Sequence, residues 1–392
     1  MRRFMLEFGA LAAAVAAGAL AAATAGATPS LPGTWRTLPK APLDFVDQFP
    51  TSVWTGKEMI VVGRGTTYLK SGEVTRVYVG AAYDPATRTW RRIPSPPPEV
   101  SGVYGFTSVW TGKELLLWGQ GTRAAFDPAT NRWRLLPSQP ALDGAALVVW
   151  TGRETIGWGG GCCGDAWADG VAYNPSTNTW RKLARSPLHG AQHPIGAWTG
   201  RELIVFVGGL NPDTGKPWPA RFANAAAYDP ATDTWRRIAP LPAPRDDATA
   251  VWDGREVILV GGYANATKMP WTLARRGLAY DPAKNAWRTL PPMATGRMQF
   301  ASAWTGKRLL VWGGTSMPGG GAPVKPQTPP RGSAYDPATN RWSALPASPL
   351  RGCLDPTWVW TGRSLIVWGG GTGLPPYRSR TDGAAFTPAG TS

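Results

Sequence analysis

The sequence has few of the residues on which most enzyme active sites depend. Its 392 residues include three cysteines and two histidines, and 25 acidic residues stand against 41 lysines and arginines. It contains no G-x-S-x-G, H-E-x-x-H or phosphate-binding glycine motif. After the N-terminal segment, no stretch has a helical period of apolar residues. These absences argue against the common hydrolase, zinc-peptidase and nucleotide-binding classes, and against a helical fold.

The sequence instead contains a short motif, W-T-G-K/R-E with small variations, that occurs seven times at intervals of about 40 to 56 residues. A second motif, Tyr or Phe followed by Asp-Pro and then by a tryptophan, alternates with it. Repeats of this length predict a solenoid or a propeller. The tryptophans of the first motif are Trp54, Trp110, Trp150, Trp198, Trp252, Trp304 and Trp360.

Each repeat is interpreted as four antiparallel strands, termed a, b, c and d in chain order. A two-residue turn joins strand a to the apolar strand b, and Asp253-Gly254 is the strongest of these hairpin signals. Strand c ends in Asp-Pro, which opens a type I turn, and strand d begins at the next tryptophan. The last strand c, at Phe386, has no tryptophan after it, whereas Trp35 lies in a matching segment near the N-terminus. We therefore predict an all-β fold: one seven-bladed β-propeller over residues 28–392, closed by the strand at Trp35.

The pattern of an apolar strand ending in Gly-Gly, then a tyrosine, then a tryptophan resembles the kelch repeat. The first two repeats depart from it, with Gly63-Arg64 and Gly119-Gln120. The resemblance implies a kelch-type propeller like that of galactose oxidase, a fold that hosts both binding proteins and enzymes. Copper oxidases of this type take a metal ligand from a further domain that is not seen in this sequence, so we expect no cofactor. The matching pairs are Gly159-Gly160, Gly208-Gly209, Gly261-Gly262, Gly313-Gly314 and Gly369-Gly370.

The repeated residues are expected to be structural. The repeated aspartates are interpreted as turn formers and the repeated tryptophans as packing residues between blades. The a–b and c–d turns are short and regular, whereas the b–c and d–a loops vary in length. In a four-stranded meander the two variable loops emerge on one face, so that face is the expected binding face. The opposite face is expected to be inert.

The N-terminal segment, with Arg2 and Arg3 before an alanine-rich stretch and small residues after it, is typical of a secretory signal peptide over residues 1–27. We therefore expect a secreted, periplasmic or cell-envelope protein whose mature chain has no transmembrane segment and is a monomer. A retained N-terminal anchor is the alternative. The formal net charge of +16 suits anionic partners such as an acidic envelope polymer or lipid headgroups. Arginines on strand d are interpreted as protection of the outer edge, and no specific nucleic-acid motif is present.

The three cysteines fall in variable loops. Cys353 is a candidate to pair with Cys162 or Cys163, a vicinal bond between the latter two is a second possibility, and free thiols are a third. His189 and His193 follow the same blade as Cys162 and Cys163, but the four residues do not have a known zinc spacing. We therefore predict no metal site.

Three tryptophans lie outside the repeat, in the b–c loops of adjacent blades: Trp167, Trp218 and Trp271. They could form an aromatic ledge for sugar rings, with polar neighbours such as Arg221 and Arg275, or they could fold down and cover their own loops.

A second candidate site is the mouth of the central channel. Seven residues before four of the strand a tryptophans lie Asp143, Arg245, Arg297 and Cys353. The arginines, with Asp246, could hold an acidic ligand or form internal ion pairs. Paired carboxylates are also possible here, among Asp143, Asp246, Asp247 and Asp355.

The function predicted from these features is that of a binding module for a glycan or a cell-envelope polymer, acting through the variable loop face. One alternative is a sugar-modifying enzyme similar to the sialic acid mutarotases and epimerases built on kelch propellers. The other alternative is a scaffold that binds a protein partner.

Overall fold

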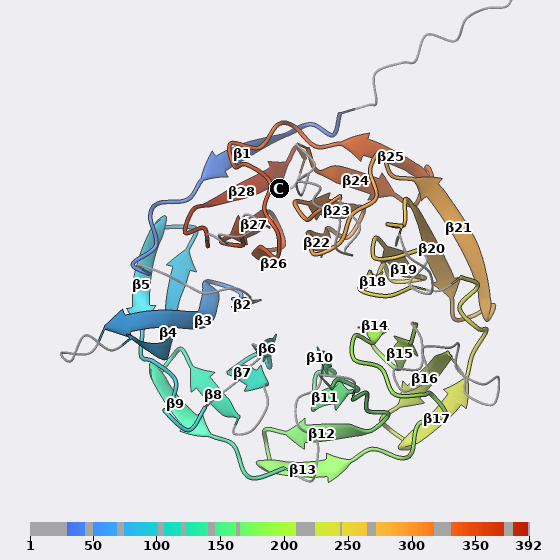
Figure 1. Ribbon diagram of the computed structural model, residues 1–392, viewed down its shortest axis with the longest axis horizontal. Helices are drawn as coiled ribbons and strands as arrows, with labels where there is room; N and C mark the ends of the chain where they lie inside the picture. The colour runs from blue at the N-terminus through green and yellow to red at the C-terminus, as the bar shows by residue number, and fades with distance from the viewer. Residues whose placement is uncertain are drawn as a thin grey trace, which may run out of the picture.

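The computed structural model describes residues 30–43, 50–68, 74–100, 106–118, 123–139, 146–161, 165–208, 224–243, 245–264, 272–316, 331–371 and 379–390. These residues form seven four-stranded antiparallel sheets, arranged as blades around a central axis (Figure 1). The predicted seven-bladed propeller is therefore confirmed. In the part of the chain that the structure describes, no helix is long and apolar enough to cross a membrane.

The blades share one order of strands from the axis outward. Strands a form the inner edge: β2 (Thr51–Trp54), β6 (Thr107–Trp110), β10 (Leu147–Trp150), β14 (Ile195–Trp198), β18 (Thr249–Trp252), β22 (Ala301–Trp304) and β26 (Thr357–Trp360). Strands b are β3 (Met59–Tyr68), β7 (Leu115–Trp118), β11 (Thr155–Trp158), β15 (Leu203–Phe206), β19 (Val257–Val260), β23 (Leu309–Trp312) and β27 (Leu365–Trp368).

The outer half of each blade completes the sheet. Strands c are β4 (Val74–Asp84), β8 (Ala124–Asp127), β12 (Gly170–Asn174), β16 (Ala225–Asp229), β20 (Arg276–Asp281), β24 (Ser333–Asp336) and β28 (Gly383–Pro388). Strands d are β5 (Thr89–Ile93), β9 (Arg132–Leu135), β13 (Thr179–Lys182), β17 (Thr234–Arg237), β21 (Ala286–Pro292), β25 (Arg341–Ala344) and, from the N-terminal region, β1 (Gly33–Thr37).

The ring closes as the divided repeat predicts. Strand β1 pairs antiparallel with β28, and Trp35 lies opposite Phe386. The last blade therefore takes three strands from the C-terminal region and one from the N-terminal region. All seven blades are complete between Gly33 and Pro388.

The a–b turns are two-residue hairpins with glycine at the first central position. Gly254 has a φ of 99°, and the flanking Asp253 N–H donates to the Glu256 carbonyl at 3.1 Å. A positive φ at the first central position is a conformation that glycine adopts without steric cost. The fifth hairpin is thus confirmed, but its central pair is Gly254-Arg255 and not Asp253-Gly254. The residue after the glycine stands at the tip of the turn.

The c–d turns confirm the structural role of the repeated aspartates. The Asp84 carboxylate accepts the Ala86 N–H at 2.8 Å, and Asn174 makes the same bond to Ser176 at 2.9 Å. Such a bond fixes the turn and requires only a side-chain oxygen. The same bond is made by Asp127, Asp229, Asp281 and Asp336.

The repeated tryptophans join neighbouring blades, as predicted. Strand d tryptophans donate their indole N–H to a carbonyl of the preceding blade; Trp133, for example, bonds to Pro94 at 2.7 Å. The strand b tryptophans are almost fully buried, at 0–2% exposure. These four are Trp118, Trp158, Trp312 and Trp368.

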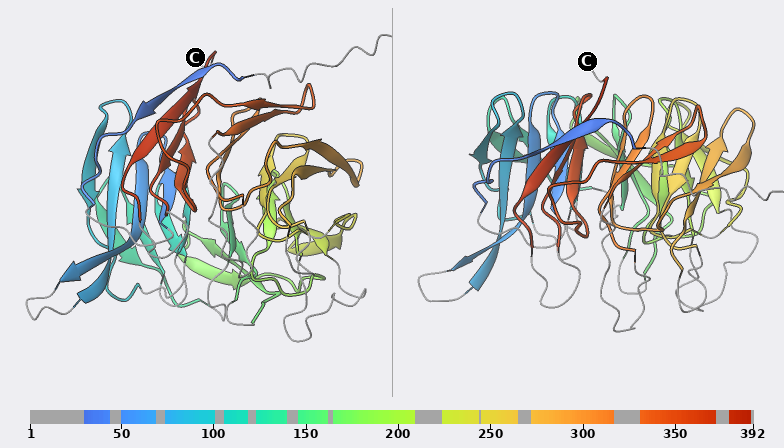
Figure 2. Two further views of the ribbon diagram at one scale, coloured as in Figure 1. Left: turned by 45° about the horizontal axis from the view of Figure 1, so that its top comes forward. Right: turned by 90° about the horizontal axis from the view of Figure 1, so that it is seen from above.

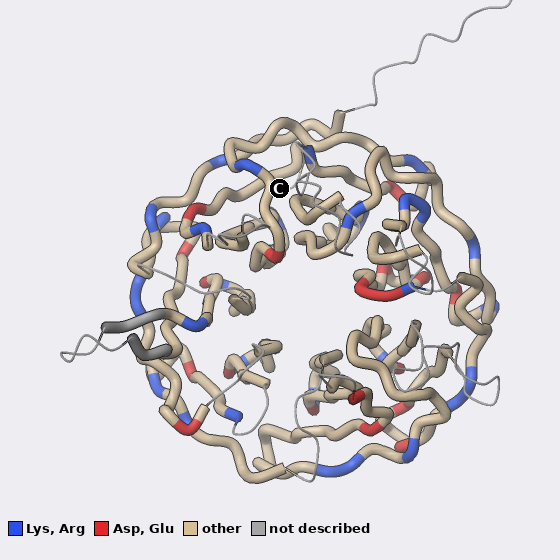
Figure 3. The backbone as a smooth tube through the Cα atoms, viewed as in Figure 1, with Lys and Arg blue, Asp and Glu red and all other residues tan. Residues whose placement is uncertain are grey.

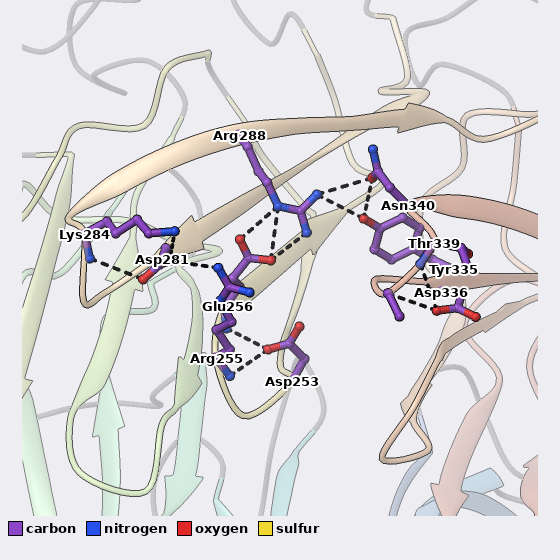
Figure 4. A network of polar contacts seen from close by, with 11 residues as sticks. Asp253, Arg255, Glu256, Asp281, Lys284, Arg288, Tyr335, Asp336, Thr339 and Asn340 are labelled. Atoms are coloured by element: carbon purple, nitrogen blue, oxygen red, sulfur yellow. Dashed lines mark hydrogen bonds and ion pairs between the residues drawn. The ribbon is translucent and has the colours of Figure 1, made fainter.

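Arginines of strand d have a role beyond the edge protection that we predicted. Arg288 of β21 donates to both carboxylate oxygens of Glu256, which follows the a–b turn of the same blade, and the closest distance is 2.6 Å. Its Nη1 then reaches the next blade and donates to the Tyr335 hydroxyl at 3.1 Å and to Asn340 Oδ1 at 3.3 Å (Figure 4). Related Arg–Glu pairs are Arg91–Glu58, Arg134–Glu114, Arg181–Glu154 and Arg236–Glu202. We call each such set an interblade clamp.

The two faces of the ring differ. The a–b and c–d turns lie on one face, here called the tight face, because the antiparallel order places both at the same ends of the blades (Figure 2). The b–c and d–a connections lie on the other face, here called the loop face. A binding site built from connections of different lengths belongs on the loop face.

Candidate binding site on the loop face

Four successive blades place a polar residue at one equivalent position on the loop face, two residues before strand a begins. These residues are His193, Asp247, Gln299 and Asp355, which precede β14, β18, β22 and β26. Asp247, Gln299 and Asp355 have positive φ angles of 55°, 55° and 45°. The Asp355 N–H donates to the Gln299 carbonyl at 3.1 Å, which links blades six and seven. We call these four residues the axial polar arc.

The left-handed backbone of the arc has an energetic cost for residues other than glycine. Positive φ angles at other non-glycine residues lie in c–d turns, where asparagine, aspartate and one arginine occupy them. In the arc, by contrast, the strained residues lie at the inner edge of the ring, where they precede the innermost strands. Strained backbone is concentrated at functional sites in many proteins, so the arc is a candidate site.

Carboxylates dominate the charge of the arc. Figure 3 shows acidic segments at the inner edge beside β18 and β26. Burial raises the pKa of Asp355 to about 7, and the nearby Asp247 carboxylate adds to this rise. Burial likewise raises the pKa of Asp247 and of Asp246, while the charge of His193 opposes both shifts. His193 Nδ1 lies 3.9 Å from Asp246 Oδ1, and the His193 ring is exposed.

Arg245 and Arg297, which we predicted to hold an acidic ligand or to form internal ion pairs, both donate to main-chain carbonyls. Arg297 is 2% exposed, and its guanidinium donates to the carbonyls of Gly313 at 3.2 Å and Arg331 at 3.3 Å within its own blade. Burial lowers the pKa of Arg297 to about 10. Arg245 is also buried and donates to the Arg276 carbonyl at 2.8 Å. These bonds hold both guanidinium groups against the main chain at the loop-face ends of strands b and c.

Of the predicted aromatic ledge, Trp167 is described and is half-buried. The Ala191 N–H donates to the Trp167 carbonyl at 3.2 Å, and Gln192 Nε2 donates to the Asp165 carbonyl at 2.8 Å. The Trp167 loop is therefore bonded to the loop that carries His193, at one end of the arc. Trp218, Trp271 and Arg221 lie outside the described residues.

The remaining predicted residues do not join the arc. Arg275 is exposed, and its Nε donates to the Met293 carbonyl at 3.0 Å. Cys353 is a buried free thiol packed among the residues of blades six and seven, and burial raises its pKa to about 12. Cys162, Cys163 and Asp143 lie outside the described residues. Because Cys353 is free in this structure, its predicted pairing with Cys162 or Cys163 is not seen, and a bond between Cys162 and Cys163 stays a prediction. Among the described residues, no group of three His, Cys, Asp or Glu side chains is arranged to hold a metal ion.

The sequence pattern indicates part of the arc but not all of it. Asp246, Asp247 and Asp355 were considered as possible paired carboxylates, but His193 and Gln299 were not connected with them. All four arc residues lie five residues before a strand a tryptophan, whereas the sequence pattern was followed at the position seven residues before it. The column at five residues is the signal that would have found them.

Comparison with known proteins supports the repeat family. The chain is similar to Kelch-like protein terF of Aspergillus terreus, with 32% identity over 177 residues that cover 43% of this chain and 37% of that protein. An F-box/kelch-repeat protein of Arabidopsis thaliana is 27% identical over 186 residues, which cover 43% of this chain and 42% of that protein. Kelch-like protein 40 of Xenopus laevis is 26% identical over 160 residues, 41% of this chain and 24% of that protein. No family model matches the chain.

Among solved structures, the chain resembles a fungal alcohol oxidase of the AA5 family in complex with copper. The TM-score is 0.68, and the match covers 91% of this chain and 76% of that one, with 14% sequence identity. At this identity the likeness shows the fold alone. Together with the kelch relatives and the seven-bladed ring, it establishes the class of the protein.

The chain is a kelch-repeat β-propeller. It matches less than half the length of each of the three relatives above. All three have kelch in their names, and a kelch propeller suggests a binding or protein-interaction module.

Proposed function

We propose that the protein is an exported binding module that takes a glycan over the axial polar arc of its loop face. The observation that carries the proposal is the placement of His193, Asp247, Gln299 and Asp355 at one equivalent position of four successive blades, next to the Trp167 loop. A rigid ring that presents polar groups in an arc can contact several hydroxyls of one ligand. The N-terminal segment typical of a signal peptide supports export.

The chemistry of the arc suits a polyhydroxylated ligand. Carboxylate and amide oxygens accept hydrogen bonds from sugar hydroxyls, and an indole stacks on the apolar face of a sugar ring. Half-buried acceptors make stronger bonds than fully hydrated ones, because less water competes for them. The backbone fixes the arc before binding, so little entropy is lost when the ligand arrives.

The sign of the charge selects among sugars. Asp246, Asp247 and Asp355 repel one another and would repel a ligand carboxylate. Arg297, which could have offset this repulsion, is buried and donates to main-chain carbonyls within its own blade. We therefore favour neutral or amino sugars over sialic acids and over acidic polymers at this site.

The test is saturation-transfer NMR of the propeller with a panel of neutral, amino and acidic sugars, including wall-derived glycans. We expect transfer to neutral or amino sugars and a loss of about ten-fold in affinity for Asp247→Asn/Asp355→Asn, because each lost charged acceptor weakens binding by about 1 kcal/mol or more. Trp167→Ala should also weaken binding. The matched control is Asp84→Asn/Asp229→Asn, which removes the same charge from turns where Asn174 shows that asparagine is accepted.

The same spectra decide between this proposal and its alternatives. Binding of sialic acid alone, or equal losses in the two double variants, would contradict a glycan site on the arc. Accelerated anomer exchange or a new product would show an enzyme, in which the raised pKa of Asp355 suits a general acid near neutral pH. No transfer to any sugar would leave a protein partner as the function of the loop face.

A further inference from the structure

The tight face, which the sequence suggested was inert, has a basic residue at the tip of each a–b turn. In every blade this residue follows the turn glycine, at the second central position of the hairpin. All seven side chains are exposed, so the seven turns form one ring of positive charge around the axis. We call this set the basic annulus: Lys57, Lys113, Arg153, Arg201, Arg255, Lys307 and Arg363.

The charge of the annulus is largely uncompensated. Among the described residues, Lys57, Lys113, Arg153, Arg201 and Lys307 form no ion pair. Arg255 has a contact of 3.8 Å with Asp281 Oδ2, which also lies 3.2 Å from Lys284 Nζ. A positive ring of this kind attracts a partner that carries a high density of negative charge.

The acidic side chains of the same face already form ion pairs or hydrogen bonds within the protein. In five blades the glutamate after the basic residue is held by its clamp arginine, as Glu256 is by Arg288. The Asp253 carboxylate accepts the N–H groups of Arg255 and Glu256. Aspartates of the c–d turns accept backbone N–H groups in the same way. The c–d turn aspartates lie in the outer part of the face, where Arg88, Arg132 and Lys284 also lie. The glutamates beside the basic residues are each neutralised by a clamp arginine, so the inner ring keeps a net positive charge.

The annulus is also regular. All seven a–b turns have the same length and the same positive φ at glycine, so each blade places its basic residue at an equivalent position of the tight face. A half-buried tryptophan lies three residues before each basic residue, from Trp54 to Trp360. Basic side chains with neighbouring indoles match the interfacial layer of a membrane, where both residue types are favoured.

We propose that the basic annulus docks the propeller onto an anionic bilayer surface. A flat bilayer can contact all seven turns together, whereas a linear polyanion can follow only part of a closed ring. Each lysine or arginine near an anionic surface contributes about 1 kcal/mol, so seven together suffice for reversible binding without any membrane-spanning segment. Docked in this way, the loop face points away from the membrane and stays open to its ligand. The inference does not depend on the identity of that ligand.

The test is co-sedimentation of residues 28–392, which contain every strand of the closed ring, with vesicles of phosphatidylcholine alone or with phosphatidylglycerol added. We expect binding to the anionic vesicles that falls steeply with salt, and little binding to the neutral ones. The variant Lys57→Gln/Lys113→Gln/Arg153→Gln/Arg201→Gln should bind at least ten-fold more weakly. Thermal unfolding of each variant checks that the ring remains folded.

The matched control removes the same number of exposed charges from outside the tight-face turns: Arg36→Gln/Lys40→Gln/Lys182→Gln/Arg185→Gln. The affinity of this control variant for the anionic vesicles should stay within about two-fold of that of the unsubstituted protein. Equal losses in the two variants would show that net charge alone drives binding, and would overturn the annulus as a site. Absence of vesicle binding would overturn the proposal, and so would binding to soluble polyglutamate or nucleic acid without binding to vesicles.

Discussion

The indole N–H of Trp35 donates to the carbonyl of Pro346 over 3.1 Å, although 311 residues separate the two in the sequence. The bond ties strand d of the last blade to the blade before it, and Trp35 also packs at 5.7 Å from Trp312, between ring centroids. The two ends of the chain thus close the ring through the same indole contact that other neighbouring blades use.

Removal of residues 1–37 is expected to open the ring. It deletes β1, exposes the hydrogen-bonding edge of β28 and removes Trp35 from the core between blades six and seven. An unpaired edge of this kind promotes aggregation. Size-exclusion chromatography should show oligomers or aggregates, whereas a matched deletion of residues 1–27 should remain a folded monomer. A folded, monomeric product of the longer deletion would contradict the closure role of β1.

The interblade clamps predict a second effect. In Glu256→Gln the Arg288 guanidinium loses its counter-charge while it stays half-buried, and we expect a loss of about 1–3 kcal/mol in the free energy of unfolding. The control is Ser343→Ala, because Ser343 occupies the position of Arg288 in a blade that lacks the clamp. Thermal or urea unfolding measures both. Equal, small changes in the two variants would show that the clamp adds nothing to stability.

Blade six lacks the interblade clamp, and two substitutions should introduce it. There, Arg308 replaces the clamp glutamate and pairs with Asp336 at 3.0 Å, and Ser343 replaces the arginine. Arg308→Glu alone should destabilise the protein, because the new carboxylate faces Asp336. In Arg308→Glu/Ser343→Arg the new pair should recover about 1 kcal/mol or more relative to the sum of the single changes. A double-mutant cycle by urea unfolding gives this coupling, and a coupling near zero would contradict the equivalence of the positions.

The fold could be predicted from the sequence because each repeat carries the same local signals: glycine in the a–b turn, aspartate in the c–d turn, and tryptophan at the start of strand d. The clamps were missed because they join side chains of two blades, and a repeat pattern shows spacing along the chain but not contacts across it. For the same reason only part of the arc was predicted, because its residues come from four different blades. The orientation of the Arg297 side chain was not predicted. A guanidinium near the axis can point into the channel or outward to main-chain carbonyls, and no sequence pattern distinguishes the two orientations.

Two aspartates of the last blade predict opposite effects of pH on stability. Burial and Asp247 raise the pKa of Asp355 to about 7, while the Arg380 guanidinium, 2.9 Å away through Nε, lowers the pKa of Asp382. Between about pH 4 and pH 7 the folded protein therefore holds a proton on Asp355 that the unfolded chain has lost, so stability falls as the pH rises through this window. For Asp382 the stabilising pair is present above about pH 4 and is lost as the pH falls through its lowered pKa.

The variants Asp355→Asn and Asp382→Asn separate these effects in one experiment, thermal unfolding followed by circular dichroism from pH 3 to pH 8. Asparagine cannot ionise and accepts the left-handed backbone of position 355. Asp355→Asn should unfold at a higher temperature than the parent at pH 8, and this gain should shrink toward pH 4. Asp382→Asn should unfold at a lower temperature at neutral pH, with a deficit that shrinks only below about pH 4. Changes of the same sign in both variants at pH 8 would mean that Asp355 is stabilised as a carboxylate, and the electrostatic account of the arc would then be wrong.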